Sequence, residues 1–186
     1  MSTIRRMNCN ELNSKSFRYC PRCASGNFGF RSQKLLKCGD CTFEFYFNSA
    51  GAVAALIVDR EGRILITTRE AEPGKGMWDL PGGFIDGGES AEEGLRREVN
   101  EELGLDIVSA EYLCSAPNLY EYKGICYSTI DLAYVCRIED ASQARALDGL
   151  GSILWERPEE IDPAKLSFAS TRNILACYVN RLDSDG

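Results

Sequence analysis

The 186-residue sequence contains no histidine. This absence excludes imidazole as a metal ligand, a general base or a phosphorylated nucleophile, so proton transfer near neutral pH falls to a carboxylate or a metal-bound water. Long apolar stretches are also missing, because no run approaches the roughly 20 residues of a membrane-spanning helix. The start, MSTIRRMNCNEL, lacks the apolar segment of a secretory signal. We therefore expect a soluble cytoplasmic protein without membrane partners, and the 44% hydrophobic content suffices for a sizeable core.

Cysteine, in contrast, is abundant, with nine residues. Four of them form the pairs CPRC and CGDC, which are separated by fourteen residues. Two such pairs near this spacing are typical of a tetrahedral Zn²⁺ site, so the predicted ligands are Cys20, Cys23, Cys38 and Cys41. Disulfides or redox chemistry are the weaker alternatives, because the cytosol is reducing. The remaining cysteines are interpreted as small buried hydrophobic side chains: Cys9, Cys114, Cys126, Cys136 and Cys177.

Charge divides the chain into two predicted domains, 1–47 and 48–186. The first carries eight Lys or Arg against three Asp or Glu, a net charge of +5, whereas the remainder has a net charge of −12. We interpret 1–47 as a short disordered start followed by a zinc ribbon, because so few residues cannot build much core without a metal. Its basic character fits nucleic-acid contact, docking on the acidic neighbour, or simple solvation, and solvation is the preferred interpretation.

Strands and helices alternate in the second domain. GAVAALIVD suits a buried strand and ILITTR a returning strand, with further strands expected at 107–114 and 125–138. A helix is predicted at 91–103, because Ser90 and Glu93 form a capping box and Gly104 suits a left-handed C-terminal cap. LSFASTRNILACYVNRL is expected to form a final amphipathic helix.

The helix at 91–103 carries an unfavourable cluster of carboxylates. Glu98 lies three and four residues from Glu101 and Glu102, and each such like-charge pair costs about 0.2–0.5 kcal/mol. The negative end of the helix dipole adds to this cost. By helical periodicity the three glutamates edge the buried face, next to Gly94, rather than the outer face. A solvated charged surface is therefore the poorer interpretation, and a divalent metal with oxygen ligands is predicted.

The surrounding sequence, GFIDGGESAEEGLRREVNEELGL, supplies the decisive motif. Five residues separate Gly83 from Glu89, and seven more separate Glu89 from the pair Arg97-Glu98. The pair Glu101-Glu102 and then Gly104 follow on the same helix and at its end. This pattern resembles the Nudix box of the Nudix hydrolases. The resemblance implies an α/β Nudix fold, a mixed β-sheet sandwiched between helices, over residues 50–186, preceded here by the small four-cysteine zinc ribbon. It also implies metal-dependent hydrolysis of a nucleoside diphosphate derivative.

The resemblance further implies roles for individual residues. Mg²⁺ or Mn²⁺ would be held by Gly83, through its carbonyl, and by Glu89, Glu98, Glu101 and Glu102. Glu98 is the first choice of general base, with Arg97 and Glu101 completing the catalytic set. Glu89 would either join the metal ligands or pair with Arg97, which would orient the carboxylates. An ordinary i,i+4 salt bridge between Arg97 and Glu101 is the simpler interpretation of Arg97, and the two roles are compatible. Because members of the family also draw the base from later loops, three further candidates stay open: Glu121, Glu156 and Glu159.

The substrate is less well defined by the sequence. Arg69, Tyr120, Tyr122 and Tyr127 are the candidate substrate-binding residues, although the tyrosines could equally pack within a sheet. A ribbon ahead of a Nudix box resembles the NADH pyrophosphatases, but Ala116 and Asn118 replace the glutamine and tryptophan of their signature. We expect a small nucleotide such as NADH or ADP-ribose. The alternative is a nucleotide-sensing regulator with a nucleic-acid-binding ribbon, which the net charge of −7 argues against. A homodimer stays open.

Overall fold

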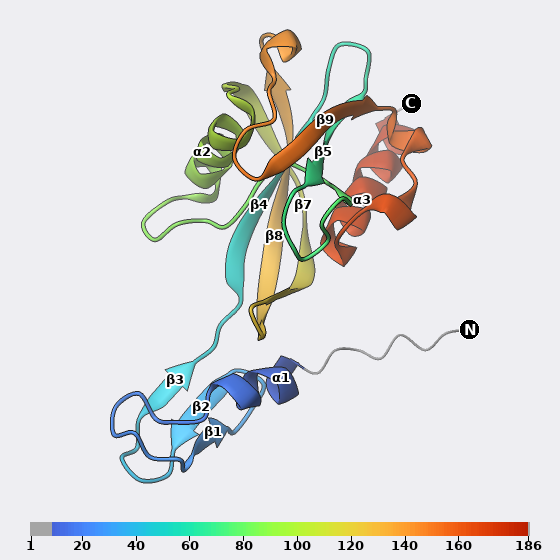
Figure 1. Cartoon of the computed structure of the whole chain (residues 1–186). Helices are drawn as coiled ribbons and strands as arrows, with labels where there is room; N and C mark the ends of the chain where they lie inside the picture. The colour runs from blue at the N-terminus through green and yellow to red at the C-terminus, as the bar shows by residue number, and fades with distance from the viewer. Residues whose placement is uncertain (1–8, 186) are drawn as a thin grey trace, which may run out of the picture. The chain divides into compact units, whose positions relative to one another are not determined.

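The computed structural model describes residues 9–185, so residues 1–8 and 186, which include part of the expected disordered start, lie outside the described residues. The chain divides into two compact units (Figure 1). The N-terminal unit consists of Met1–Ser49 and Leu119–Ser128, and the C-terminal unit of Ala50–Asn118 and Thr129–Gly186. The segment Leu119–Ser128 therefore groups with the ribbon sequence rather than with the rest of 48–186.

The N-terminal unit is built on a three-stranded antiparallel sheet in the order β1-β2-β3. Its strands are β1 (Phe28–Phe30), β2 (Leu35–Cys38) and β3 (Glu44–Tyr46). Leu36 in the central strand lies opposite Phe30 and Phe45 and is fully buried, so this face carries the small apolar core. The Phe47 ring extends the core, with its centroid 5.6 Å from that of Phe17.

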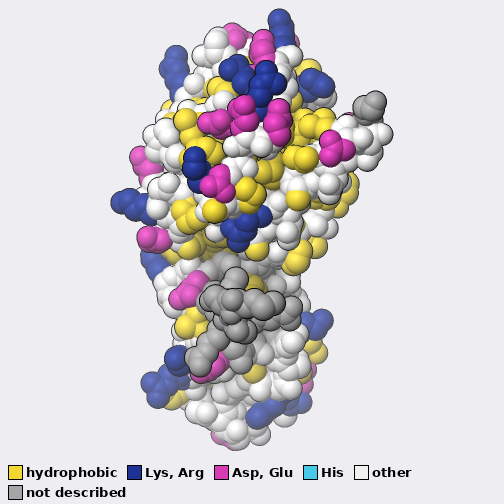
Figure 2. Space-filling model, turned by 90° about the vertical axis from the view of Figure 1, so that its right-hand side faces the viewer, with side chains coloured by type: hydrophobic (Ala, Val, Ile, Leu, Met, Phe, Trp, Pro, Cys, Tyr) yellow, Lys and Arg dark blue, Asp and Glu magenta, His cyan; other side chains and the backbone are white. Residues whose placement is uncertain are grey.

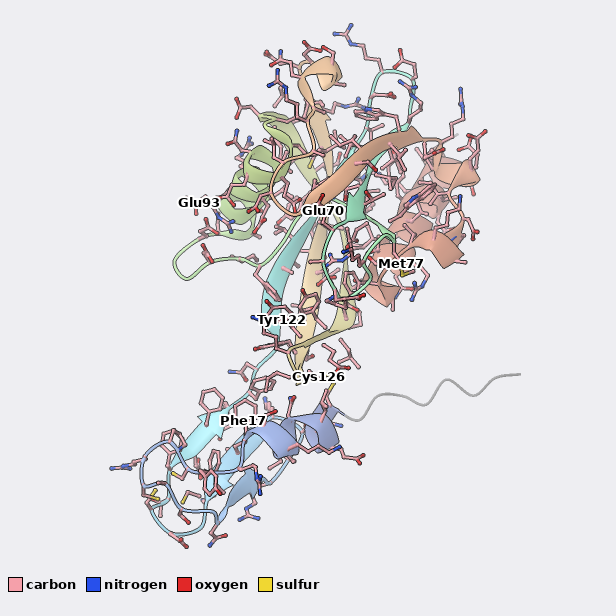
Figure 3. The ribbon with its side chains drawn as sticks, viewed as in Figure 1. Phe17, Glu70, Met77, Glu93, Tyr122 and Cys126 are labelled. Carbon is pink, nitrogen blue, oxygen red and sulfur yellow. A yellow bond between two sulfur atoms is a disulfide. The ribbon has the colours of Figure 1, made fainter. Side chains whose placement is uncertain are left out.

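Part of the expected disordered start is ordered, because Cys9–Ser16 form helix α1. Asn13 in this helix is 1% exposed. Its Nδ2 donates to the Cys126 carbonyl over 2.9 Å, and the Cys126 N–H donates to its Oδ1 over 2.7 Å. Cys9, one turn earlier, forms a disulfide with Cys126, which is labelled in Figure 3. The interpretation of Cys9 and Cys126 as unlinked small hydrophobic side chains is therefore wrong, because positions 9 and 13 share a helix face that meets one strand residue.

Two three-stranded sheets, in the orders β4-β8-β7 and β6-β5-β9, form the C-terminal unit. Strand β4 pairs with β8 in parallel, and β5 pairs with β9 in antiparallel register. Strands β7 and β8 are long and continue into the N-terminal unit, where the left-handed residues Lys123 and Gly124 join them. This two-residue turn matches the right-handed twist of the strands. The strand bounds are β4 (Ala50–Ile57), β5 (Ile64–Arg69), β6 (Trp78–Asp79), β7 (Ile107–Tyr122), β8 (Ile125–Ile138) and β9 (Leu150–Glu156).

Helices α2 (Ala91–Leu103) and α3 (Ala169–Asp185) lie on opposite sides of the strands (Figure 1). The alternation of β4 produces this arrangement, since successive side chains of a strand point to opposite faces. Val53, Ala55 and Ile57 belong to the core cluster that contains the apolar residues of α2. Leu56 belongs to the cluster that contains those of α3. The expected mixed α/β sandwich is confirmed, and three 3₁₀ turns complete it: Ala141–Gln143, Pro158–Glu160 and Pro163–Lys165.

Helix α2 has the predicted limits. The Ser90 hydroxyl accepts from the Glu93 N–H over 3.2 Å, and the Glu93 carboxylate accepts from the Ser90 N–H over 2.8 Å. Gly104 adopts a φ of 67° and donates its N–H to the Asn100 carbonyl over 2.8 Å. Both predicted caps are therefore confirmed, and they fix the rotation of the helix that carries the glutamates.

None of the helices within residues 9–185 is both long enough and apolar enough to cross a membrane. On the face shown in Figure 2, hydrophobic side chains are scattered among acidic and basic ones. Single exposed hydrophobic residues in such a mixture are normal for a protein surface.

Candidate active site and metal centres

In the candidate active site, the backbone of the segment Pro81-Gly82-Gly83 lies directly against strand β4. The Val53 N–H donates to the Gly83 carbonyl over 2.9 Å, and the Ala55 N–H donates to the Pro81 carbonyl over 2.8 Å. Gly82 has a φ of 142°, and a Cβ on it would lie 2.1 Å from the Val53 carbonyl oxygen. Only glycine fits this position. The Gly83 carbonyl, an expected metal ligand, therefore already accepts one hydrogen bond and keeps one lone pair.

Two glutamates of α2 reach this glycine segment. A Cβ on Gly83 would lie 2.6 Å from the Glu98 carboxylate, so the missing side chain makes room for that group. The Gly82 N–H donates to Glu102 Oε2 over 2.9 Å. Glu98 and Glu102 are consequently held against the same turn of backbone, from the edge of the buried helix face that the sequence predicts.

Arg97 joins the remaining carboxylates. Its guanidinium donates to Glu89 at 2.8 and 3.0 Å, to Glu98 at 2.9 Å and to Glu101 at 3.1 Å. It also donates to the Phe84 carbonyl over 3.0 Å. Five donors in a rigid plane suit this task, whereas a lysine offers one point charge. Both predicted partners of Arg97, Glu89 and Glu101, are present.

Gly94 leaves the space that the sequence analysis expects beside the carboxylates. A Cβ on Gly94 would lie 3.2 Å from Glu89 Oε2, so Glu89 occupies that space. The Asp86 N–H donates to the same oxygen over 3.0 Å. Hydrogen bonds to its carboxylate, first of all from Arg97, lower the pKa of Glu89 and keep it ionised.

The two glutamates beside the glycine turn have the opposite electrostatic character. Burial raises the pKa of Glu98, and the adjacent Arg97 opposes the shift only in part. Burial raises the pKa of Glu102 to about 8, although the Gly82 N–H stabilises the anion, and the charges of Glu98 and Asp79 raise it further. Burial is thus the main cause of both shifts, neighbouring carboxylates add to it, and a bound cation would stabilise the ionised forms of Glu98 and Glu102.

Arg69, an expected substrate-binding residue, lies near Glu102 and is engaged within the fold. Its Nη1 donates to Asp79 Oδ2 over 3.1 Å, and its Nε donates to the Pro73 carbonyl over 2.7 Å. Asp79 also accepts from the Thr171 hydroxyl over 2.8 Å, and burial raises its pKa. Asp79 is not among the predicted site residues, and the signal for it in the sequence is an acidic residue within the apolar stretch GMWDLPGGF.

The three candidate tyrosines lie in the N-terminal unit, apart in the chain from the box residues. The Tyr127 ring packs against Phe47, with centroids 5.9 Å apart, and Tyr120 packs against Tyr122 at 6.2 Å. The Lys123 ammonium lies 5.0 Å from the Tyr122 ring centroid. The alternative bases are also dispersed: Glu121 lies in β7, Glu156 in β9 and Glu159 in the second 3₁₀ turn.

The four cysteines of the ribbon converge. Their sulfur atoms all lie within 4.8 Å of one another, and within residues 9–185 this is the one group of three or more possible metal-ligating side chains that meets that distance. Cys20 and Cys41 are 3.6 Å apart, and Cys23 and Cys38 are 3.7 Å apart. Burial raises the pKa of Cys38, but the N–H groups of Asp40 and Cys41 outweigh it and lower the pKa to about 7. Such a set fits a tetrahedral Zn²⁺ ion, which binds thiolates.

The carboxylate oxygens of the box do not form so close a group as the cysteine sulfur atoms, which all lie within 4.8 Å of one another. Glu98 is 15% exposed and Glu101 is 52% exposed, so the group is open to solvent on the Glu101 side. The donor set is nevertheless all oxygen, as Mg²⁺ and Mn²⁺ prefer. The residues fit a divalent ion by charge and by ligand type.

Comparison with known proteins agrees with this geometry. The chain is 24% identical over 172 residues to the NAD-capped RNA hydrolase NudC of Vibrio parahaemolyticus, covering 92% of this chain and 63% of that protein. It is 41% identical over 80 residues to the ADP-ribose pyrophosphatase of Methanocaldococcus jannaschii, covering 42% of this chain and 47% of the other. The chain thus spans less than two thirds of either relative's length.

The fold has close counterparts among solved structures. A NUDIX hydrolase from Nitrosomonas europaea superposes with a TM-score of 0.65 at 20% identity, covering 85% of this chain and 88% of that one. Residues 49–176 match the NUDIX domain family, and this match takes in the glycine turn, α2 and all its glutamates. From the motif, the fold and this match together, the chain belongs to the NUDIX family.

Proposed function

We propose that the protein is a metal-dependent pyrophosphohydrolase that cleaves the diphosphate linkage of a nucleoside diphosphate derivative. One observation carries the proposal: Glu98 and Glu102 are held side by side against the Gly82-Gly83 turn, and both have raised pKa values. A fold gains no stability from crowding carboxylates in this way, whereas a cation-dependent site requires it.

The residue roles follow from the contacts. Glu89, Glu98, Glu101, Glu102 and the Gly83 carbonyl are proposed to hold Mg²⁺ or Mn²⁺. When bound, the ion supplies positive charge that offsets the charge of the phosphate oxygens. Arg97 fixes three of the carboxylates through its hydrogen bonds and is in this sense a positioning residue.

Glu98 is proposed as the general base. Its pKa is raised by burial, which brings its basicity closer to neutral pH, where a base is most effective. A water oxygen forms a bond to one phosphorus, the bond from that phosphorus to the bridging oxygen breaks, and Glu98 takes the proton of the water. The products are two phosphate monoesters, so ADP-ribose would give AMP and ribose phosphate.

The proposed substrates are NADH, ADP-ribose and related dinucleotides or nucleotide sugars. The relatives named for NAD-capped RNA and for ADP-ribose support this class, because both compounds contain a diphosphate between two nucleoside or sugar groups. The charge of Arg69 opposes the rise in the pKa of Glu102, so Arg69 is proposed to supply a cation at the edge of the site. The four-cysteine ribbon is proposed to hold one structural Zn²⁺ ion.

Hydrolysis of ADP-ribose and NADH with added Mg²⁺ or Mn²⁺ tests the proposal. Glu101→Gln removes one charge at nearly constant shape and should lower kcat about 10- to 100-fold or more, since even the outer-shell partners of metal ligands contribute about 10- to 100-fold. Glu92→Gln is the matched control on the same helix, since it keeps an acceptor for the Tyr134 hydroxyl, which now donates over 3.0 Å. Wild-type turnover of Glu101→Gln at saturating metal would show that Glu101 is no ligand. Tight binding of ADP-ribose without turnover would favour a nucleotide-sensing regulator.

A further inference from the structure

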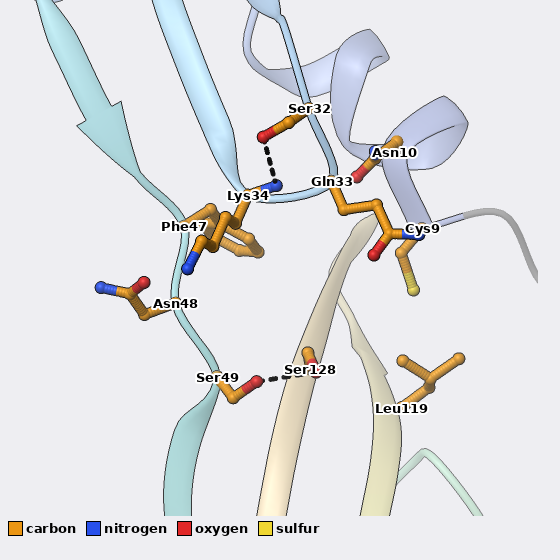
Figure 4. A pocket seen from close by; sticks show the side chains of 10 residues that line it. All are labelled: Cys9, Asn10, Ser32, Gln33, Lys34, Phe47, Asn48, Ser49, Leu119 and Ser128. Atoms are coloured by element: carbon orange, nitrogen blue, oxygen red, sulfur yellow. Dashed lines mark hydrogen bonds between the residues drawn. The ribbon is translucent and has the colours of Figure 1, made fainter.

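The N-terminal unit contains a pocket of about 820 Å³ that has no part in the chemistry proposed above. Figure 4 shows it from close by. Its walls come from the start of α1, the loop before β2, the segment after β3 and the two ends of Leu119–Ser128, all within one compact unit. We call it the ribbon pocket.

The polar lining of the ribbon pocket consists of amides, hydroxyls and one ammonium group, without a carboxylate. The amides belong to Asn10, Gln33 and Asn48, and the ammonium group to Lys34. Phe47 and Leu119 supply apolar surface. The chain has a net charge of −7, yet the residues that line this pocket include no carboxylate. An anionic ligand in the pocket would therefore meet no like charge from the lining.

The hydroxyls of the pocket are paired, since those of Ser49 and Ser128 lie 3.0 Å apart, but its amides and its ammonium group have no side-chain partner within residues 9–185. The side-chain amides of Asn10, Gln33 and Asn48 form no hydrogen bond there, and Lys34 forms no ion pair. Two other polar side chains of the same unit are paired: Asn27 donates to Asp40 over 2.8 Å, and Lys37 contacts Glu44 at 2.7 Å. The amides and the ammonium group of the pocket are therefore available to a ligand.

The Phe47 ring is fixed in place. Its centroid lies 5.6 Å from that of Phe17, 6.4 Å from Phe45 and 5.9 Å from Tyr127. The side chain remains half-buried, so part of the ring is open to the pocket. A pre-positioned aromatic surface costs little entropy when a planar ligand packs on it.

From this lining we propose that the ribbon pocket binds a nucleoside phosphate. A primary amide presents a donor and an acceptor side by side, which complements the edge of a nucleobase. The Lys34 ammonium complements a phosphate, and Phe47 with Leu119 offers the apolar surface on which a base packs. The ligand is a free nucleotide or one nucleotide of a single-stranded RNA, since both present the same groups.

The charge of the whole unit supports the same ligand. Residues 1–49 and 119–128 carry nine Lys or Arg against four Asp or Glu, a net charge of +5. Four thiolates around one Zn²⁺ would lower this to about +3. The net charge of −7 for the whole chain, which argues against nucleic acid, thus hides a unit that attracts phosphates.

The test uses the full zinc-loaded chain without added Mg²⁺ or Mn²⁺, so that no probe is hydrolysed. Two probes are titrated, AMP and a 12-nucleotide oligoadenylate. Lys34→Glu is expected to weaken the binding of at least one probe about tenfold or more. The neutral double variant Gln33→Ala/Asn48→Ala is expected to weaken the binding of that probe about three- to tenfold.

Lys15→Glu is the matched control, because Lys15 is an exposed α1 cation of the same unit outside the pocket. Lys34→Ala should also lower the salt dependence of oligonucleotide binding by about one unit of slope.

The two probes separate the sources of the ligand. Parallel losses for AMP and the oligoadenylate identify a mononucleotide site, and a loss for the oligoadenylate alone identifies an RNA strand. The proposal is overturned if neither probe binds, or if Lys34→Glu weakens binding no more than Lys15→Glu does. Hydrolysis of ADP-ribose with Mg²⁺ should stay within about twofold of wild type in all pocket variants, so failure here and failure of the proposed activity are separate results.

Discussion

Replacement of Asn13 by alanine is the sharpest test of how the N-terminal unit is held together. Asn13 is 1% exposed, and its amide is paired with both backbone groups of Cys126, at 2.9 and 2.7 Å. Cys126 itself is fully buried. Alanine removes the amide but leaves the N–H and the carbonyl of Cys126 in the same place, without partners.

The expected cost follows from those two orphaned groups. A buried donor or acceptor that loses its partner costs about 1–3 kcal/mol, so the pair predicts a loss of about 2–6 kcal/mol. Asn13→Asp should be at least as damaging near pH 7, because a carboxylate accepts from the Cys126 N–H but cannot donate to its carbonyl. Ser14→Ala is the control, since the Ser14 hydroxyl is exposed and donates to Asn10 of its own helix over 2.6 Å.

Amide hydrogen exchange of the segments 9–16 and 119–128 measures this loss without unfolding the other unit. Non-reducing conditions keep the Cys9–Cys126 disulfide, so only the hydrogen bonds change between wild type and variant. A loss of about 2 kcal/mol or more accelerates exchange about 30-fold or more. Ser14→Ala should remain within about 0.5 kcal/mol of wild type. Exchange of the Cys126 segment in Asn13→Ala that matches wild type would refute the view that this amide joins α1 to β8.

Two further predictions concern the metal centres. Cys38→Ser should abolish the binding of about one Zn²⁺ per chain, as measured by elemental analysis. The melting temperature of the C-terminal unit, detected by the fluorescence of Trp78 and Trp155, should stay unchanged, because this unit has two apolar clusters of its own. A large fall in this melting temperature would contradict the prediction. Glu102 has a pKa raised by burial to about 8, well above the usual value near 4.5. The unfolded state therefore loses its proton first, and without added divalent metal the unfolding free energy should fall as pH rises from about 4.5 to about 8. Urea midpoints at several pH values should show this fall in wild type and a smaller one in Glu102→Gln; identical slopes would count against the burial of Glu102.

Local signals in the sequence predicted the parts of the fold that depend on local physics. The limits of α2 followed from Ser90, Glu93 and Gly104, because caps act within a few residues. The position of the glutamates at the edge of the buried face followed from helical periodicity, and so did the space beside Gly94. The Arg97–Glu101 contact at 3.1 Å is likewise a neighbour relation along one helix.

The features that escaped prediction depend on distant partners. Helix α1 has no apolar stripe, and its one buried residue is an asparagine, so periodicity gives no signal for it. The Cys9–Cys126 disulfide joins positions 117 residues apart. Arg69 and Asp79 lie in different strands, and the sequence suggests only that one is basic and the other acidic. Such pairings are decided by tertiary packing rather than by local pattern.

The long β7–β8 hairpin has a consequence for how this architecture can be inherited. The polypeptide passes from one unit to the other three times, after Ser49, after Asn118 and after Ser128. The ribbon is therefore no cassette that a single recombination event could add to or delete from the gene. Deletion of the first 49 residues would expose the buried surfaces of Cys126 and Tyr127 to solvent. A fusion of those residues to another protein would leave Asn13 without its hydrogen-bond partner. Because the ribbon and the hairpin tip share these contacts, substitutions in either should be tolerated only when the other accommodates them.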